Sequence, residues 1–221
     1  RHGKRLLCPT EDGPTLLVRF GMTGGFVAGP TDPPHPHDRL ILELDRGGLR
    51  YRDQRKLGGV WLAPDEEEAA SLLSGLGPDA LEVGRRAFLD RLSRRRGGVK
   101  AALMDQGFVA GVGNLLADEI LWQAGLHPRT PVAGLDPAAR ERLYRVLRRV
   151  LRTAVARFDH QETQRRWLIR VRGLPGARCP RCGTALDRTA AAGRTTYFCP
   201  TCQPLSGPPA GAPPTTPAGG A

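Results

Sequence analysis

Short apolar runs separated by turn residues fill the first third of the chain. Residues 16–20, 40–44 and 60–62 are rich in leucine, isoleucine, valine and aromatic side chains, and each run has the length of a β-strand. The pairs Asp12-Gly13 and Gly47-Gly48 between these runs are typical turn sequences. We therefore predict a β-rich region that ends near residue 76.

A helical pattern follows from about residue 77. Residues 83–94, 99–110 and 114–124 are predicted to be helices, and glycines separate the second from the third. A fourth helix is predicted after Asp136, which is a good N-cap, with Pro137 in the first helical position. Its apolar residues recur every three to four positions, so we expect one face to pack into a core and the arginine-rich face to be solvated.

The 221-residue chain is strongly basic, with a formal net charge of +11 and a pI near 10.4. Only three of its 33 basic residues are lysines. Arginine forks bind phosphate in a bidentate fashion, although a genome rich in G and C also favours arginine codons. The charge indicates a polyanionic partner. The sequence contains neither an apolar run of about eighteen residues nor a signal peptide, so we expect a cytoplasmic protein and no membrane partner.

Four of the five cysteines form two C-x-x-C pairs, Cys179 with Cys182 and Cys199 with Cys202, with sixteen residues between the pairs. This spacing is the zinc pattern, because each pair turns tightly and the intervening hairpin brings four thiolates around one ion. A closed four-cysteine site is structural. The alternatives are an iron–sulfur site or a redox pair, and the βαβ pattern expected beside a redox pair is absent from the sequence. Cys8 stands alone in an apolar run, and we predict that it is buried.

Two stretches resemble one protein family. Residues 193–203, which read GRTTYFCPTCQ, resemble the C-terminal zinc finger of the formamidopyrimidine-DNA glycosylase and endonuclease VIII family. Residues 104–120, which contain the turn Gly111-Val112-Gly113-Asn114, resemble its helix-two-turn-helix, and the two stretches occur in the family's order. The resemblance implies an α+β fold with a remnant of an N-terminal β-sandwich, a helical domain and a zinc-finger hairpin. The expected boundaries are 1–76, 77–165 and 166–204, with a disordered tail over 205–221.

The resemblance also implies roles for residues near the damaged base. Lys4 follows Arg1-His2-Gly3 and matches the family's catalytic-site lysine. Met22 matches the residue that fills the gap left by an extruded base. Arg55 and Leu57 match the wedge loop that faces the orphaned base, where the family commonly has phenylalanine in place of Leu57. A leucine can still intercalate, but it stacks less well than an aromatic ring.

A second set of residues is expected to bind the DNA backbone. Gly111, Gly113 and Asn114 form a turn at a helix N-terminus, where small residues permit close approach and amides point at an anion. Arg194, near the tip of the zinc hairpin, is expected to grip the phosphate beside the flipped nucleotide, and we group it with Lys4 as catalytic. Lys100 is also assigned to the DNA-binding set.

The implied function is base-excision DNA repair by a bifunctional glycosylase and abasic-site lyase. In the family, the amine of an N-terminal proline attacks the sugar of a flipped nucleotide and forms a Schiff base. The Pro-Glu opening that carries this amine is absent from the sequence, so we expect a fragment that is inactive as shown. One alternative is a non-catalytic, zinc-dependent DNA-binding protein on the same scaffold. Another is a zinc ribbon for RNA or translation, which predicts no helix-two-turn-helix.

The short stretch 158–178 bears on the lesion. In oxidised-purine enzymes of the family a sizeable loop before the finger covers the flipped base, and this stretch has little room for it. It therefore favours the endonuclease VIII side, with oxidised pyrimidines as substrates. The family also implies a monomer that binds damaged double-stranded DNA, with a bacterial, nucleoid-associated location.

Overall fold

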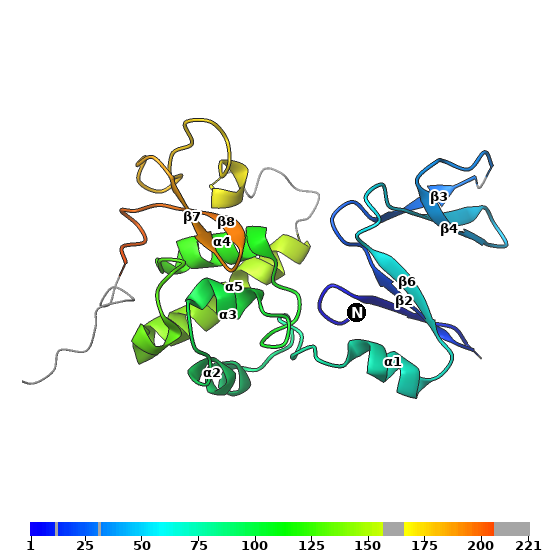
Figure 1. The fold of residues 1–221 in the computed structure, drawn as a ribbon, viewed down its shortest axis with the longest axis horizontal. Helices are drawn as coiled ribbons and strands as arrows, with labels where there is room; N and C mark the ends of the chain where they lie inside the picture. The colour runs from blue at the N-terminus through cyan, green and yellow to red at the C-terminus, as the bar shows by residue number, and fades with distance from the viewer. Residues whose placement is uncertain (12, 31, 157–165, 206–221) are drawn as a thin grey trace, which may run out of the picture. The chain divides into compact units, whose positions relative to one another are not determined.

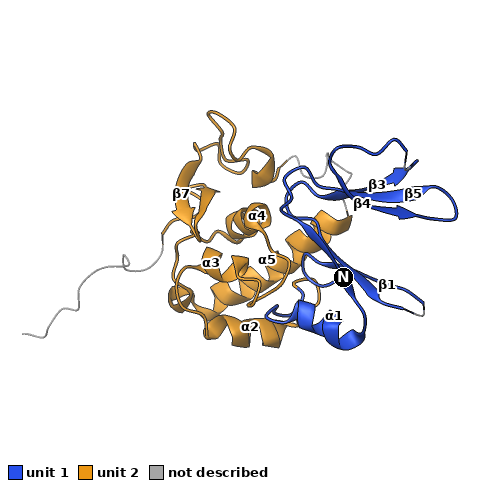
Figure 2. Cartoon of the chain, turned by 45° about the vertical axis from the view of Figure 1, so that its right-hand side comes forward, with its two compact units in different colours: residues 1–79 blue, residues 80–221 orange. Residues whose placement is uncertain are grey.

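The computed structural model describes residues 1–11, 13–30, 32–156 and 166–205. The chain forms two compact units, Arg1–Asp79 and Ala80–Ala221 (Figure 2). Residues 206–221 of the predicted tail and part of the predicted short stretch 158–178 lie outside the described residues. Within the described ranges, no helix is both long and apolar enough to cross a bilayer.

The first unit contains two three-stranded antiparallel sheets among its described residues. One sheet has the order β1-β2-β6, with β1 at Leu6–Pro9, β2 at Thr15–Arg19 and β6 at Gly59–Ala63. The other has the order β3-β5-β4, with β3 at Gly25–Gly29, β5 at Gly48–Arg52 and β4 at Asp38–Glu43. The three predicted strands are present as β2, β4 and β6. Leu17 and Val18 of the first apolar run are buried in β2, and such half-buried pleated surfaces favour apolar β-branched and aliphatic side chains.

Two features of this unit differ from the sequence-based expectation. Helix α1, Glu66–Leu73, lies in the region expected to be β-rich. Asp65 caps it by accepting a hydrogen bond from the backbone N–H of Glu68, and its first turn is acidic, which suits a helix N-terminus. The helix has no buried residues, so it lacks the apolar stripe that would have predicted it. Cys8 is only half-buried in β1, so the prediction that it is buried was wrong.

The second unit is built on four α-helices among its described residues: α2 at Arg85–Ser93, α3 at Val99–Met104, α4 at Asn114–Ala124 and α5 at Pro137–Ala156. Helix α5 begins as predicted, because the Asp136 side chain accepts a 2.6 Å hydrogen bond from the N–H of Ala139. Helix α4 ends at Gly125, whose φ of +66° suits glycine. Helix α3 is shorter than predicted, because Asp105 adopts an extended conformation. The buried faces of these helices form the main hydrophobic core.

The end of the described chain adds a hairpin to the same unit. Strands β7, Asp187–Ala191, and β8, Arg194–Phe198, pair antiparallel and lie against α4 (Figure 1). The turn between them contains Ala192 and Gly193, with φ of +53° and +66°. Two positive φ values at the centre of a two-residue turn are typical of the tight hairpins that match strand twist. The turn leaves Arg194 as the first residue of β8.

Candidate DNA-binding surfaces and a four-cysteine metal site

The four paired cysteines converge on one point. Their sulfur atoms all lie within 4.8 Å of one another, with separations of 3.9 Å for Cys179–Cys202 and 3.5 Å for both Cys182–Cys199 and Cys182–Cys202. A disulfide needs a bond of about 2.05 Å. Four thiolates at about 2.3 Å from a central ion would be separated by about 3.8 Å. The donor set therefore fits a tetrahedral metal site.

Helix α4 supports this metal site. The indole nitrogen of Trp122 donates a 3.3 Å hydrogen bond to the sulfur of Cys179, and the guanidinium of Arg181 lies over the Trp122 ring. Trp122, Leu168, Cys179 and Cys199 form a small buried cluster. Outer contacts of this kind orient metal ligands, so the helical core holds these cysteines in place.

Gln203 makes a second link between the finger and the helical core. Its buried side chain accepts a 2.9 Å hydrogen bond from the backbone N–H of Cys199 and donates a 2.8 Å hydrogen bond to the carbonyl of Leu126. His127, next along the chain, packs edge-on against Phe198. The segment after α4 therefore fixes where the hairpin lies.

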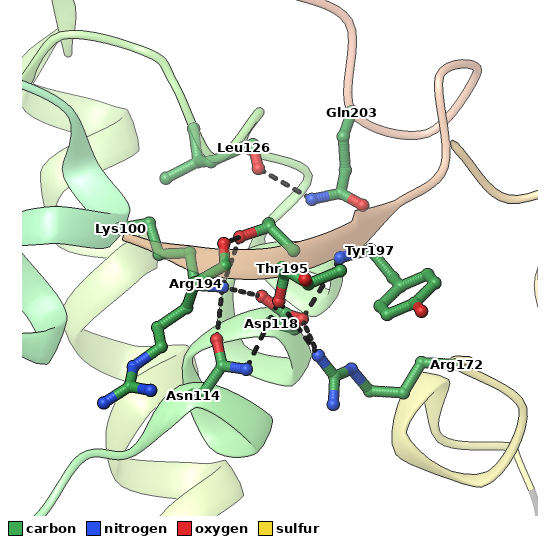
Figure 3. A network of polar contacts seen from close by, with 10 residues as sticks. Lys100, Asn114, Asp118, Leu126, Arg172, Arg194, Thr195, Tyr197 and Gln203 are labelled. Carbon is green, nitrogen blue, oxygen red and sulfur yellow. Dashed lines mark hydrogen bonds and ion pairs between the residues drawn. The ribbon is translucent and has the colours of Figure 1, made fainter. Parts of the chain in front are cut away.

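Asn114, at the first position of α4, contacts the hairpin directly. Its side-chain nitrogen donates a 3.3 Å hydrogen bond to the carbonyl of Thr195, the residue after Arg194 (Figure 3). Arg194 is exposed, and its side chain extends away from the ion pairs of the network (Figure 3). The structure thus brings two predicted backbone-binding residues, Asn114 and Arg194, to the same part of the second unit.

Lys100 does not have the exposed position that a DNA-binding residue needs. It is completely buried, and its ammonium lies 2.6 Å from Asn114 Oδ1, Thr196 Oγ1 and Asp118 Oδ1. Burial lowers the pKa of Lys100, while the hydrogen bond and charge of Asp118 oppose that effect. Because the donors of Lys100 are directed to protein acceptors, this lysine, predicted to belong to the DNA-binding set, is not placed for direct contact with DNA.

Two charged residues of this network were missed by sequence reasoning. Arg172 lies 2.7 Å from Asp118 Oδ2, and the same oxygen accepts a 3.2 Å hydrogen bond from the backbone N–H of Tyr197 (Figure 3). Asp118 is buried on α4, one helical turn after Asn114. A carboxylate on a buried helix face is the one sequence signal that could have indicated a charged partner.

The turn before α4 is organised by Gln106. Its side chain accepts a 3.1 Å hydrogen bond from the N–H of Gly111 and donates to the carbonyls of Met104 and Val112. Gly111 has a φ of +118°, which only glycine adopts readily. Gly113 is the N-cap and has an extended conformation open to other residues. No side chain caps α4, so the N–H groups of its first turn are not used by a cap.

In the first unit, Asp53 ties together the two loops that carry Met22 and Arg55. Its buried carboxylate accepts hydrogen bonds from the Thr23 hydroxyl at 2.6 Å and from the backbone N–H groups of Gly58 at 2.8 Å and Arg55 at 3.2 Å. The Thr23 hydrogen bond, with the backbone hydrogen bonds, holds the pKa of Asp53 below its ordinary value. Asp53 was not singled out from the sequence.

The predicted wedge and gap-filling residues lie on these loops. Met22 is 73% exposed and Leu57 is 44% exposed, which is high for large apolar side chains. Arg55 is also exposed, and its guanidinium approaches the sulfur of Met22 at 3.7 Å. Gly21, with a φ of +67°, permits this approach of the loops, because a Cβ there would lie 2.7 Å from backbone atoms of Leu57 and Gly58.

Lys4 lies in a different turn of the same unit. His2 and Arg5 pair across this turn, and Gly3 has a φ of +57°. The carboxylate of Asp79 accepts a 2.6 Å hydrogen bond from the N–H of Gly3 and so holds the turn in place. Lys4 is exposed, and partial burial of its ammonium lowers its pKa.

Models of three domains from known proteins match successive segments of the chain. The model of the formamidopyrimidine-DNA glycosylase N-terminal domain matches residues 1–60, that of its H2TH domain matches residues 75–165, and that of the zinc finger found in FPG and IleRS matches residues 176–205. Together they define the class as a DNA-binding repair glycosylase with a metal-bearing finger. The H2TH match excludes the zinc ribbon for RNA or translation, which predicted no such domain.

Individual proteins agree with the domain matches. The chain is 40% identical to a formamidopyrimidine-DNA glycosylase of Symbiobacterium thermophilum, over 93% of this chain and 72% of that protein. It is 39% identical to that of Thermomicrobium roseum, over 93% and 80%. The crystal structure of the Lactococcus lactis glycosylase, bound non-covalently to DNA with an AP site, has a TM-score of 0.83 at 30% identity, covering 92% of this chain and 79% of that one. The chain belongs to the formamidopyrimidine-DNA glycosylase family, and its function is that of a DNA glycosylase in base-excision repair.

Proposed function

We propose that the chain recognises damaged double-stranded DNA by inserting side chains of the first unit and gripping the backbone with the second. The observation that carries the proposal is the hydrogen bond from Asn114 to Thr195, which joins the N-terminus of α4 to the zinc hairpin. Helix N-terminal amides and an exposed arginine are both suited to phosphate. Asn114, Gly111, Gly113 and Arg194 are the proposed backbone-binding residues.

Insertion is the proposed role of Met22, Arg55 and Leu57. Turning a nucleotide out of a duplex costs a few kcal/mol of stacking and pairing, and inserted side chains offset that cost by filling the void. The exposure of Met22 and Leu57 supports this role, because apolar side chains otherwise favour burial. The contact between Arg55 and Met22 indicates that they enter the duplex together.

Removal of an oxidised base through a Schiff-base intermediate is the proposed chemistry, on the strength of the family; the proline amine that forms this intermediate in the family is not among the 221 residues of this sequence. Lys4 is proposed to place positive charge at the reacting sugar, and its position in a turn held by Asp79 supports a fixed location. Arg194 is proposed to hold the adjacent phosphate. No observation on these residues favours the non-catalytic alternative.

Zinc is the proposed ion of the four-cysteine site. The donor set and the sulfur separations fit zinc, which prefers four thiolates in a closed tetrahedron. With four protein ligands, zinc would supply no catalytic position and would stabilise the hairpin that carries Arg194. Mass spectrometry under native conditions should find one zinc ion per chain, and a metal-free chain or another metal would contradict the assignment.

Two observations point to different damaged bases as the substrate. The relatives are named for formamidopyrimidine, a ring-opened purine, whereas the short stretch 158–178 favours oxidised pyrimidines. That stretch lies partly outside the described residues, so the pyrimidine preference stays a prediction. We propose formamidopyrimidine lesions, and retention on duplexes that carry either lesion would decide between the two.

The proposed function is tested by binding to duplexes that differ only at one site. One duplex carries a tetrahydrofuran abasic analogue, and the other is undamaged. We expect the 221-residue chain to prefer the damaged duplex, and the Met22→Ala variant to lose much of that preference while retaining affinity for undamaged DNA. Equal affinity of the wild-type chain for both duplexes would defeat the proposal. A titration should also give one chain per lesion if the protein is a monomer.

A further inference from the structure

A completely buried lysine lies directly behind Asn114. The ammonium of Lys100 lies 2.6 Å from the side-chain oxygens of Asn114 and Asp118 (Figure 3). It also lies 2.6 Å from the hydroxyl oxygen of Thr196. An ammonium has three donors and no acceptor, and here it donates hydrogen bonds to Asn114 and Thr196 and forms an ion pair with Asp118. The three acceptors come from α4 and from β8, and Lys100 therefore holds both elements at one point.

This arrangement determines which way the Asn114 amide faces. Its oxygen must point toward Lys100, because the flipped amide would direct its own donors at an ammonium. The side-chain nitrogen then points the other way, where it donates to the carbonyl of Thr195. One of its two N–H groups makes that hydrogen bond, and the second is available to an outside acceptor. A phosphate oxygen accepts hydrogen bonds only, so the orientation is the one that phosphate requires.

The charges of the cluster favour an anion at the same place. Lys100 and Arg172 carry two positive charges, and both contact the single carboxylate of Asp118. All three side chains are at least nine-tenths buried, so water screens them weakly. The three residues together carry one excess positive charge beside Asn114. A DNA phosphate that binds Asn114 would supply the missing negative charge.

We propose that Lys100 is a positioning residue that fixes the Asn114 amide with its N–H groups toward a DNA phosphate. Asp118 supports this arrangement, because its carboxylate pairs with Lys100 and Arg172 and accepts a hydrogen bond from the N–H of Tyr197 on β8. The inference rests on the proposed function of Asn114. It makes the helix N-terminus and the zinc hairpin a single preorganised surface, with Lys100 acting through Asn114 and not touching DNA.

The composition of the chain permits a direct spectroscopic test. Asn114 is the only asparagine in the sequence, so selective labelling with ¹⁵N-asparagine gives a single side-chain NH₂ signal. We expect the tetrahydrofuran duplex to shift one proton of this NH₂ group strongly downfield, as a hydrogen bond to phosphate forms. In Lys100→Met, the amide loses its fixed orientation, and the shift should be lost or much reduced. An unchanged DNA-induced shift in Lys100→Met would overturn the proposal.

Affinities give an independent test. Asn114→Ala should weaken binding to the tetrahydrofuran duplex by about tenfold, the value of one hydrogen bond to a charged group. Lys100→Met should weaken it at least as much, and the double variant should bind no worse than Lys100→Met alone. Losses that multiply in the double variant would overturn the proposal. Arg55→Ala, in the other unit, is the control, and its loss should multiply with that of Lys100→Met.

Two further controls separate positioning from folding. Lys100→Met leaves Asp118 paired with Arg172, so no buried carboxylate is left without a cation, and metal content and thermal unfolding check the fold. Asn114→Asp keeps Lys100 and places an oxygen where the N–H groups point, so it should bind more weakly than Asn114→Ala. Equal affinities of these two variants would count against the proposed orientation. A wild-type chain without lesion preference would defeat the proposed function instead.

Discussion

The hydroxyl of Thr23 donates a 2.6 Å hydrogen bond to the carboxylate of Asp53, and this contact joins two loops of the first unit. The same carboxylate accepts backbone hydrogen bonds from Arg55 and Gly58. Met22 precedes Thr23, and Leu57 precedes Gly58, so one buried acid positions both apolar side chains that we propose to enter DNA. This fixed geometry favours insertion, because side chains held in place in advance lose less conformational entropy when they bind.

Asp53→Asn should therefore lower lesion preference without removing DNA binding. An amide can accept at its oxygen, but its nitrogen would face donors that the carboxylate now accepts from, so at least one hydrogen bond is lost. We expect weaker discrimination between abasic and undamaged duplexes, with affinity for undamaged DNA nearly unchanged. Asp45→Asn, an exposed acid of the same unit, is the matched control and should behave as wild type. Full discrimination by Asp53→Asn would contradict the assigned role.

The lowered pKa of Asp53 predicts that the first unit becomes less stable at low pH. A carboxyl whose pKa is lower when folded stabilises the fold above its unfolded pKa, which is about 3.9, and loses that contribution as pH falls through the folded pKa. Asp38 contributes in the same direction, because hydrogen bonding by Arg52 lowers the pKa of Asp38 to about 2. We would measure the thermal unfolding midpoint from about pH 6 to about pH 2, which is about two units on either side of the unfolded pKa. The midpoint should fall as the pH drops below about 4. Asp53→Asn should show a smaller loss, and an identical pH profile would contradict the prediction.

Removal of the metal should release the hairpin but spare the first unit. Metal binding and folding are coupled in small cysteine sites, because four thiolates without an ion repel and leave the turn unsupported. We expect a chelator to weaken DNA binding by about tenfold or more, because the charged hydrogen bond from Arg194 to phosphate would be lost. Added zinc should restore the affinity. Trp122, whose indole contacts Cys179, should report the change by fluorescence. Retention of full affinity by a chain shown to be metal-free would contradict this prediction.

Leu57→Phe should strengthen binding to the damaged duplex. Leu57 is 44% exposed, and an aromatic ring in its place could stack on the unpaired base, which is worth about 1–3 kcal/mol per base. Part of that gain is offset by the entropy of ordering the ring, so an increase of several-fold in affinity for the tetrahydrofuran duplex is expected. Leu44→Phe, at another exposed leucine of the unit, is the control and should have no effect. No difference between the two variants would remove Leu57 from the wedge.

Local signals along the chain predicted part of the fold well. Helix α4 begins and ends at the predicted residues, because Gly113 precedes it and Gly125 stops it. The four cysteines converge as their spacing indicated. Helix α1 was missed, since its polar surface lacks the periodic apolar stripe that reveals a packed helix.

The buried network could not be predicted in the same way. The position of Lys100 depends on Asp118 and Thr196, which lie far along the chain and on other elements, and no local pattern marks such partners. Arg172 looks like one more arginine in a basic sequence until Asp118 is placed beside it. Asp53 likewise has its role only because Thr23 approaches it in the fold. Charged groups that act through distant partners are the residues that sequence patterns leave out.

The β7–β8 hairpin is proposed to hold the DNA backbone through Arg194, and the salt dependence of binding tests this contact most directly. The slope of log affinity against log salt concentration measures the number of phosphate contacts, at about 0.9 per contact. Arg188→Ala removes the same charge from an exposed position on the same hairpin. We predict that Arg194→Ala lowers the slope by about one contact and that Arg188→Ala leaves it unchanged; equal slopes for the two variants would contradict the account.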